Sequence, residues 1–146
     1  MPAYEHCDQS AERIRLAYSH ALNTFLQVFT KYKQLKKRFN NETLEKCSLS
    51  ADRTFFDKNG AIRWEIVHPM MPKELEENIK KEFALLSEKE IKLCCLLLFD
   101  VPVCVISNIL PYTNQSVHTK TYEIKKKTGV KNLKNYLTRL LLPEGF

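Results

Sequence analysis

A run of hydrogen-bonding side chains lies near the C-terminus, immediately ahead of three consecutive lysines. The run consists of Asn114, Gln115, Ser116, His118, Thr119 and Tyr122, and the lysines are Lys125, Lys126 and Lys127. Polar side chains of these types can hydrogen-bond to base edges when a helix presents them to the major groove. Lysines further along the same helix can reach phosphates, which set register and affinity rather than base preference. The residue types therefore predict contacts with duplex DNA.

The charge of the chain is concentrated in the same region. Residues 114–146 contain seven Lys or Arg and two Asp or Glu, so they carry +5 of the net charge of +6. A localised basic face is typical of proteins that bind nucleic acid or another anionic surface, although a solvated helix face has the same composition. The side chains expected to contact phosphates are Thr113, Lys120, Lys125, Lys126, Lys127 and Lys131.

The flanking sequence predicts helices that would position these side chains. Ser87 followed by Glu90 predicts a capping box that opens an apolar helix over 91–99. Asp100 and Pro102 are expected to be the cap and an early residue of a short helical element that ends at Leu110, and the three-residue turn 111–113 follows it. Thr113 is expected to cap the next helix, with Val117, Thr121 and Ile124 facing inward and Gly129 ending it; a last helix begins near Asn132. Two short helices joined by such a turn have helix-turn-helix spacing, with recognition helix Asn114–Lys127.

Residues 86–142 contain four short motifs in order: Leu86–Glu90 with the sequence LSEKE, Ile106-Ser107 with Leu110, Thr113 with Ser116-Val117, and Ile124 with Lys127-Thr128-Gly129-Val130. Together they resemble the LuxR/GerE-type helix-turn-helix domain of bacterial transcriptional regulators, which opens with L-[ST]-x-[RK]-E. The resemblance implies four helices, base contacts from His118, Thr119 and Tyr122, and dimer contacts from the last helix. Asp100 stands where the family usually has glycine.

The N-terminal region predicts one long amphipathic helix from Ser10 to Phe39. Its apolar residues alternate steps of four and three, which is heptad spacing: Ile14, Tyr18, Ala21, Phe25, Val28, Tyr32 and Leu35, followed by Phe39. Leu22, Leu26 and Phe29 widen the stripe. We expect the seven residues from Ile14 to Leu35 to form a dimerisation seam between two copies of the chain; packing of the same face on the chain's own second half is the alternative.

Between the two regions, TFFDKNGAIRWEIV predicts a small β-hairpin around Asn59-Gly60. A helix is expected to begin at Pro72. We therefore expect a helical and hairpin region for dimerisation or interaction over 1–71, and a C-terminal four-helix DNA-binding domain over 72–146. The expected fold class is mainly α.

Composition argues against several other kinds of site. The three glycines, Gly60, Gly129 and Gly145, are too dispersed for a phosphate-binding loop or a dinucleotide fingerprint. No apolar run approaches the roughly 18 residues that a bilayer span requires. The five cysteines contain no C-x-x-C pair. We therefore expect a cytoplasmic protein with no membrane segment, metal site or small-molecule cofactor.

No constellation in the sequence predicts catalysis. His118 and Cys104 have no acidic residue nearby to complete a nucleophile–base–acid arrangement. The expected function is a sequence-specific, homodimeric DNA-binding transcriptional regulator. The alternative is a protein–protein interaction module, in which the helix-turn-helix is only a packing scaffold and the N-terminal helix docks a partner.

Overall fold

The computed structural model describes residues 9–38 and 53–142, and within them the fold is all-helical, with no strand. This confirms the expected mainly-α class and the long N-terminal helix. The elements in chain order are α1 (Gln9–Arg38), α3 (Trp64–Val67), η1 (His68–Met70), α4 (Leu75–Glu82), α5 (Glu88–Leu98), α6 (Val103–Ile106), α7 (Asn114–Thr128), α8 (Leu133–Thr138) and η2 (Arg139–Leu141).

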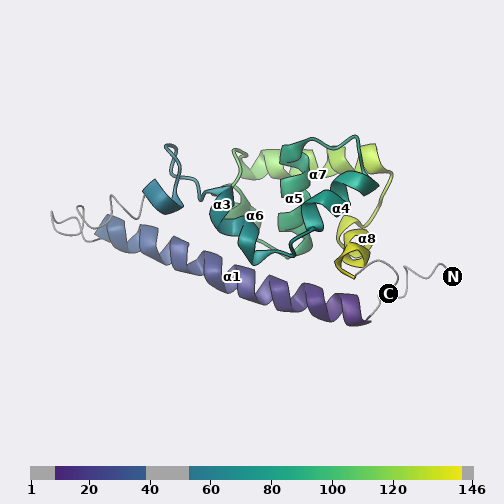
Figure 1. Cartoon of the computed structure of the whole chain (residues 1–146). Coiled ribbons are helices and arrows are strands. Elements are labelled where there is room, and N and C mark those ends of the chain that lie inside the picture. The colour runs from purple at the N-terminus through teal and green to yellow at the C-terminus, as the bar shows by residue number, and fades with distance from the viewer. Residues whose placement is uncertain (1–8, 39–52, 143–146) are drawn as a thin grey trace.

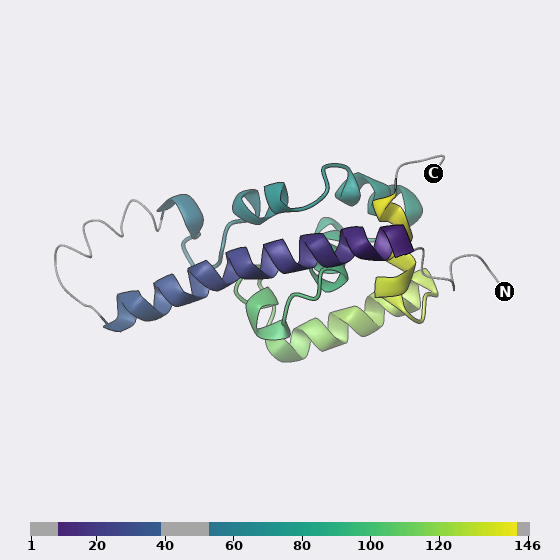
Figure 2. The ribbon, with the colours of Figure 1, turned by 90° about the horizontal axis from the view of Figure 1, so that it is seen from below.

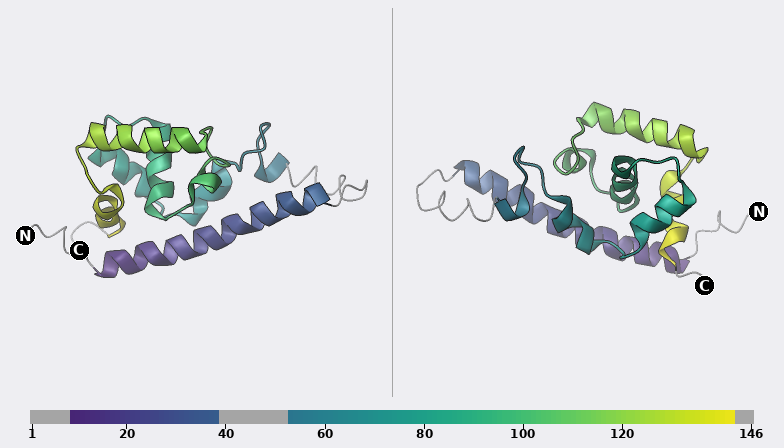
Figure 3. Two further views of the ribbon diagram at one scale, coloured as in Figure 1. Left: turned by 180° about the vertical axis from the view of Figure 1, so that it is seen from behind. Right: turned by 45° about the horizontal axis from the view of Figure 1, so that its top comes forward.

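Helix α1 lies along one side of the molecule and α7 on the opposite side, with α5 between them (Figures 1 and 3). Seen from below, α1 runs the length of the helical body (Figure 2). Its Leu22, Leu26 and Phe29 are buried in the same core as Leu93 of α5 and Leu137 of α8. One core therefore joins the two regions that were expected on either side of residue 72.

Polar side chains of α1 also cap the C-terminal end of α5. Ser19 Oγ donates to the carbonyl of Phe99 at 2.7 Å, and Asn23 Nδ2 donates to the same oxygen at 3.0 Å. Arg15, which is buried, donates from Nη1 to the carbonyl of Leu98 at 3.4 Å. The last carbonyls of a helix lack partners within it, so these bonds satisfy groups that burial would otherwise leave unpaired.

Helix α5 is the central buried helix of the fold. Ser87 Oγ accepts from the Glu90 amide at 3.2 Å, while Glu90 Oε1 accepts from the Ser87 amide at 3.0 Å, which confirms the predicted capping box. Cys94 and Cys95 are both fully buried in the core. Burial raises the pKa of the Cys94 thiol to about 12, so this side chain behaves as a small apolar residue at neutral pH.

The connection from α5 to α7 differs from the prediction in its details. Asp100, expected to act as a cap, instead occupies the left-handed region with φ of 57°, and Pro102 precedes the short helix α6. Turns continue from α6 to Leu110, whose amide donates to the carbonyl of Ile106 at 2.9 Å. The segment between α6 and α7 is therefore longer than the expected three residues, because the chain unwinds into turns that bury Ile109 and Leu110.

The predicted β-hairpin is wrong. Phe56 and Ile62 form a single antiparallel bridge, residues 53–55 are helical, and Trp64 begins α3. The amide of Ile62 donates to the carbonyl of Asn108 at 2.7 Å, so part of its hydrogen bonding is used outside the bridge. The helix expected from Pro72 begins at Leu75. Among the residues that the structure describes, no helix is both long and apolar enough to cross a membrane.

Candidate nucleic-acid interface

Helix α7 has one buried face and one exposed face. Val117 and Ile124, two turns apart, are buried, and Thr121 between them is half-buried. The exposed side chains recur every three or four residues, so they follow one helix face: Gln115, His118, Thr119, Tyr122, Lys125 and Lys126. The exposed fraction of Tyr122 reaches 59%. We call these six residues the outer face of α7.

The first turn of α7 is held by local side-chain bonds. Thr113 is the N-cap, and its Oγ1 accepts from the Ser116 amide at 3.1 Å. The hydroxyls of Thr113 and Ser116 lie 2.9 Å apart. Asn114 Oδ1 accepts from Ser107 Oγ at 2.8 Å. Of the predicted base-contacting residues, Gln115, His118, Thr119 and Tyr122 therefore share the outer face, whereas Asn114 and Ser116 are engaged in fixing the start of the helix.

The predicted phosphate-contacting lysines fall into two groups. Lys125, Lys126 and Lys131 are exposed, and Lys126 Nζ lies 5.0 Å from the centroid of the Tyr122 ring. Lys120 instead pairs with Glu123 across 3.1 Å, and the hydrogen bond to that carboxylate raises the pKa of Lys120. Lys125 and Lys126 thus make the C-terminal end of the outer face positively charged.

Lys127 has a partner that the sequence did not indicate. Its ammonium lies 2.9 Å and 3.0 Å from the two carboxylate oxygens of Glu90, whose side chain is only 2% exposed. Burial opposes ionisation of Glu90, but the hydrogen bonds from the Ser87 amide and from Lys127 lower its pKa below the ordinary value. The pair joins the end of α7 to the start of α5 and fixes the orientation of α7 on the core.

Lys127→Ala is expected to destabilise the fold, whereas Lys125→Ala is not. Removing Lys127 leaves a buried carboxylate without its cation, and a loss of about 2 kcal/mol in the free energy of unfolding is expected. Lys125 is exposed, so its loss should change stability by less than about 0.5 kcal/mol. Urea unfolding followed by circular dichroism measures both variants. Equal stability of the two would contradict a structural role for the Lys127–Glu90 pair.

The predicted seam residues of α1 are split between two environments. Tyr18, Phe25 and Tyr32 are half-buried and pack against the chain's own core, and Ile14 is also half-buried. Ala21, Val28 and Leu35 are exposed, the last two by 61% and 50%. Part of the apolar stripe therefore covers the core, and one edge of it remains at the surface.

A second link between α1 and the C-terminal region is Asp100. Its Oδ2 accepts from Arg15 Nη1 at 2.6 Å and its Oδ1 from Lys134 Nζ of α8 at 3.0 Å. These bonds lower the pKa of Asp100, although partial burial opposes the shift. The acidic residue at a position where glycine was expected was the only sign of this contact in the sequence.

Across residues 9–38 and 53–142, no group of three His, Cys, Asp or Glu side chains is placed to hold a metal ion. The arrangement that stands out is the outer face of α7, which joins hydrogen-bonding side chains to a cationic end. In comparisons with protein-family models, curated proteins and solved structures, no significant match to this chain was found.

Proposed function

We propose that this chain is a sequence-specific DNA-binding transcriptional regulator of the cytoplasm that reads the major groove with α7. In this proposal α6, the turns after it and α7 act as a helix-turn-helix, with Asn114–Lys127 as the recognition helix. The observation that carries the proposal is the outer face of α7, which is exposed on the side of the molecule opposite α1 (Figure 3). The resemblance of residues 86–142 to the LuxR/GerE-type domain supports the same function.

The outer face divides by chemistry into two parts. Gln115, His118 and Thr119 lie in the first two turns, where a recognition helix contacts base edges. Lys125 and Lys126 lie in the last turn, where their charges can meet phosphates. The side chains that hold α7 in place are separate ones, since Val117, Ile124 and Lys127 contact the core. The outer face is therefore available to a ligand without any loss of packing.

Selection of bound sites from a random duplex library tests this function. Sequence-specific recognition should enrich a defined motif, and affinity for the selected duplex should fall steeply with salt as counterions are released from phosphates. Thr119→Ala should relax the preference at one base position, at a cost of about 1 to 3 kcal/mol of discrimination. Failure to enrich any motif, together with affinity that salt does not change, would overturn the proposal.

The exposed edge of α1 favours assembly into a homodimer. Ile14, Ala21, Val28 and Leu35 are spaced by seven residues, so they stay in line along a helix that pairs with another helix. In this proposal the edges of two α1 helices meet, and each α7 remains free for one half-site. Two-fold symmetry of such a dimer would appear as a palindromic motif in the selected duplexes.

Val28→Glu is expected to convert the dimer into monomers without unfolding it. The Val28 side chain is 61% exposed within one chain, so a carboxylate costs little there, but in the dimer it would be buried and unpaired. Gln27, directly before Val28, is also exposed and lies outside the seven-residue spacing. Gln27→Glu adds the same charge there and serves as the control. Sedimentation or size-exclusion with light scattering gives the mass. Retention of dimer mass by Val28→Glu would contradict the seam.

The exposed apolar side chains of α1 also support a second function, a protein-interaction module in which α1 docks another protein. Val28 and Leu35 are each at least half exposed and lie one above the other on the same edge of the helix, so together they offer an apolar strip to a partner. A stable complex with a different protein, lost in Val28→Glu, would favour this function if no duplex is bound.

A further inference from the structure

A tight turn projects from the surface beside the connection that leads into α7. In this turn, residues 57–60, the amide of Gly60 donates to the carbonyl of Asp57 at 3.0 Å. Asp57 Oδ1 accepts from the amides of Asn59 and Ala61, each at 2.9 Å. Gly60 has φ of +80°, a conformation that other residues rarely adopt. The turn is therefore held in one shape by its own backbone and by the Asp57 side chain, and Lys33 of α1 also donates to the carbonyl of Gly60.

The base of the turn is anchored to the same body that carries α7. Phe56 and Ile62, on either side of it, are 5% and 3% exposed, and the Phe56 ring stacks on Tyr32 of α1 with centroids 6.1 Å apart. The bond from the Ile62 amide to the Asn108 carbonyl, 2.7 Å long, joins the turn to the segment between α6 and α7. The turn and α7 therefore keep a fixed relation to each other.

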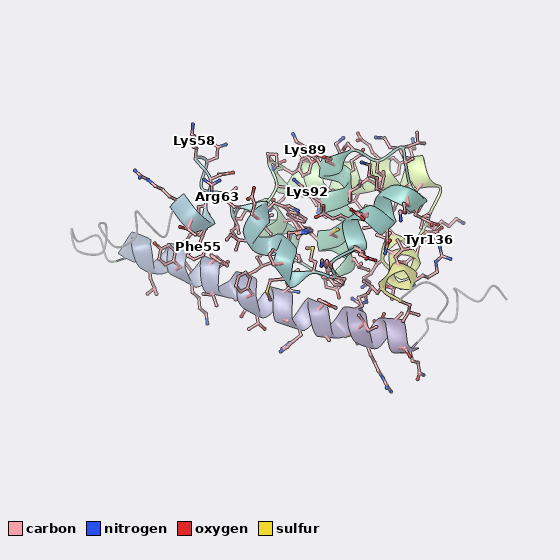
Figure 4. The ribbon with its side chains drawn as sticks, viewed as in Figure 1. Phe55, Lys58, Arg63, Lys89, Lys92 and Tyr136 are labelled. Carbon is pink, nitrogen blue, oxygen red and sulfur yellow. The ribbon has the colours of Figure 1, made fainter. Side chains whose placement is uncertain are left out.

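The turn projects to the side of the molecule on which α7 lies, away from α1 (Figures 1 and 3). Lys58 stands at its outer end and points away from α1, whereas Phe55 points toward α1 (Figure 4), where its ring lies 5.4 Å from that of Phe29. The end of the turn nearest solvent thus carries a cation on the proposed DNA side.

The charges around the turn favour an anionic partner. Lys58 and Arg53 are exposed. Arg63, whose Nε donates to the carbonyls of Arg53 and Phe56, and Lys33 of α1, whose ammonium donates to the carbonyl of Gly60, add two more positive charges. The one acidic residue within the turn is Asp57, whose Oδ1 accepts from backbone amides of the turn, so its charge is partly compensated. Lys58 is therefore presented outward as the group best placed to meet a phosphate.

We propose that the 57–60 turn is a second DNA contact, in which Lys58 meets the phosphate backbone beyond the N-terminal end of α7. This inference rests on the proposed function. A duplex with α7 in its major groove, about 12 Å wide, continues past the helix on both sides, so its phosphates face whatever projects beside α7. A rigid turn with an outward lysine there adds affinity and register but no base preference.

The test compares Lys58→Ala and Lys58→Glu with Lys31→Glu, measured by fluorescence anisotropy on a labelled mixed-sequence duplex of about 40 base pairs across a salt series. Lys31 is an exposed lysine of α1, on the opposite side of the molecule, so its replacement makes the same charge change away from the DNA. Lys58→Ala should reduce the magnitude of the log–log salt slope by about 0.9. Lys58→Glu should weaken binding about tenfold, with the motif selected from a random library unchanged.

The outcomes separate this inference from the proposed function. If the unmodified chain binds no duplex, both are overturned. If it binds and Lys125→Ala lowers the salt slope while Lys58→Ala leaves it unchanged, only the contact from the 57–60 turn is overturned. Equal weakening by Lys31→Glu and Lys58→Glu also overturns it, because the effect would then come from net charge alone.

Discussion

Replacing Lys125 and Lys126 together with glutamate should weaken duplex binding about 100-fold at low salt, because two phosphate contacts become two repulsions. Both side chains are exposed at the C-terminal end of the outer face of α7 and neither contacts the core, so the fold should be retained. Fluorescence anisotropy measures the affinity, and circular dichroism checks the helix content.

The matched control is Arg13→Glu combined with Lys31→Glu. These two residues are exposed on α1, eighteen positions and thus five helical turns apart, so they lie on one outward line of the helix on the side opposite α7. The change in net charge is identical in the two double variants. Affinity that falls equally in both would show that binding depends on overall charge, and would remove α7 from the proposed interface.

Asp100→Ala should produce the largest loss of stability among single substitutions at polar residues that join α1 to the rest of the fold. The substitution removes a carboxylate from the buried Arg15 guanidinium, and it places an alanine at φ of 57°. We expect a loss of about 3 kcal/mol in the free energy of unfolding. Urea denaturation followed by circular dichroism measures it.

Two further variants at this position separate the causes. Asp100→Gly removes the same carboxylate but fits the left-handed backbone, so its loss should be about 1 kcal/mol smaller than that of alanine. Asparagine has nearly the same shape as aspartate and tolerates a positive φ, so Asp100→Asn measures the contribution of the charge to stability. Equal stability of the alanine and glycine variants would show that the positive φ carries no cost here.

The charge contribution of Asp100 should also depend on pH. The pKa of Asp100 is lowered in the folded state, so its carboxylate stabilises the fold above the unfolded pKa, and this stabilisation is lost as pH falls through the folded pKa. The stability difference between the unmodified chain and Asp100→Asn should therefore shrink as the pH falls from about 5 to below the ordinary aspartate pKa of about 3.9. A difference that stays constant over this range would contradict the ion pair with Arg15.

Local signals in the sequence predicted most of the helices. The capping pair Ser87 and Glu90, the Thr113 cap and Gly129 at the left-handed C-cap each act within a few residues, and they place the start of α5 and both ends of α7. The β-hairpin prediction was wrong because local signals do not decide strand pairing. Asn59-Gly60 did specify a tight turn, but whether the flanking residues pair as strands depends on what they pack against, and here they belong to helical segments and to the core.

Most of the outer face of α7 can be predicted from the sequence, because its period and its residue types are local properties of one helix; Asn114 and Ser116 differ, because they hydrogen-bond at the start of the helix. The sequence does not show which lysines are available to a ligand, because Lys127 is paired with Glu90, a residue 37 positions earlier. The same holds for Arg15 and Asp100, which are 85 positions apart. Such pairs are decided by how helices pack, and no local pattern encodes them.

The apolar stripe of α1 shows the same division most clearly. Its periodicity by itself determined that residues 9–38 form an amphipathic helix, because spacing of three and four places apolar side chains on one face. Only the tertiary structure decided that Leu22, Leu26 and Phe29 cover the chain's own core while Val28 and Leu35 stay at the surface. The apolar stripe is wider than the part of α1 that contacts the rest of the chain. Packing therefore decides which of its residues are buried.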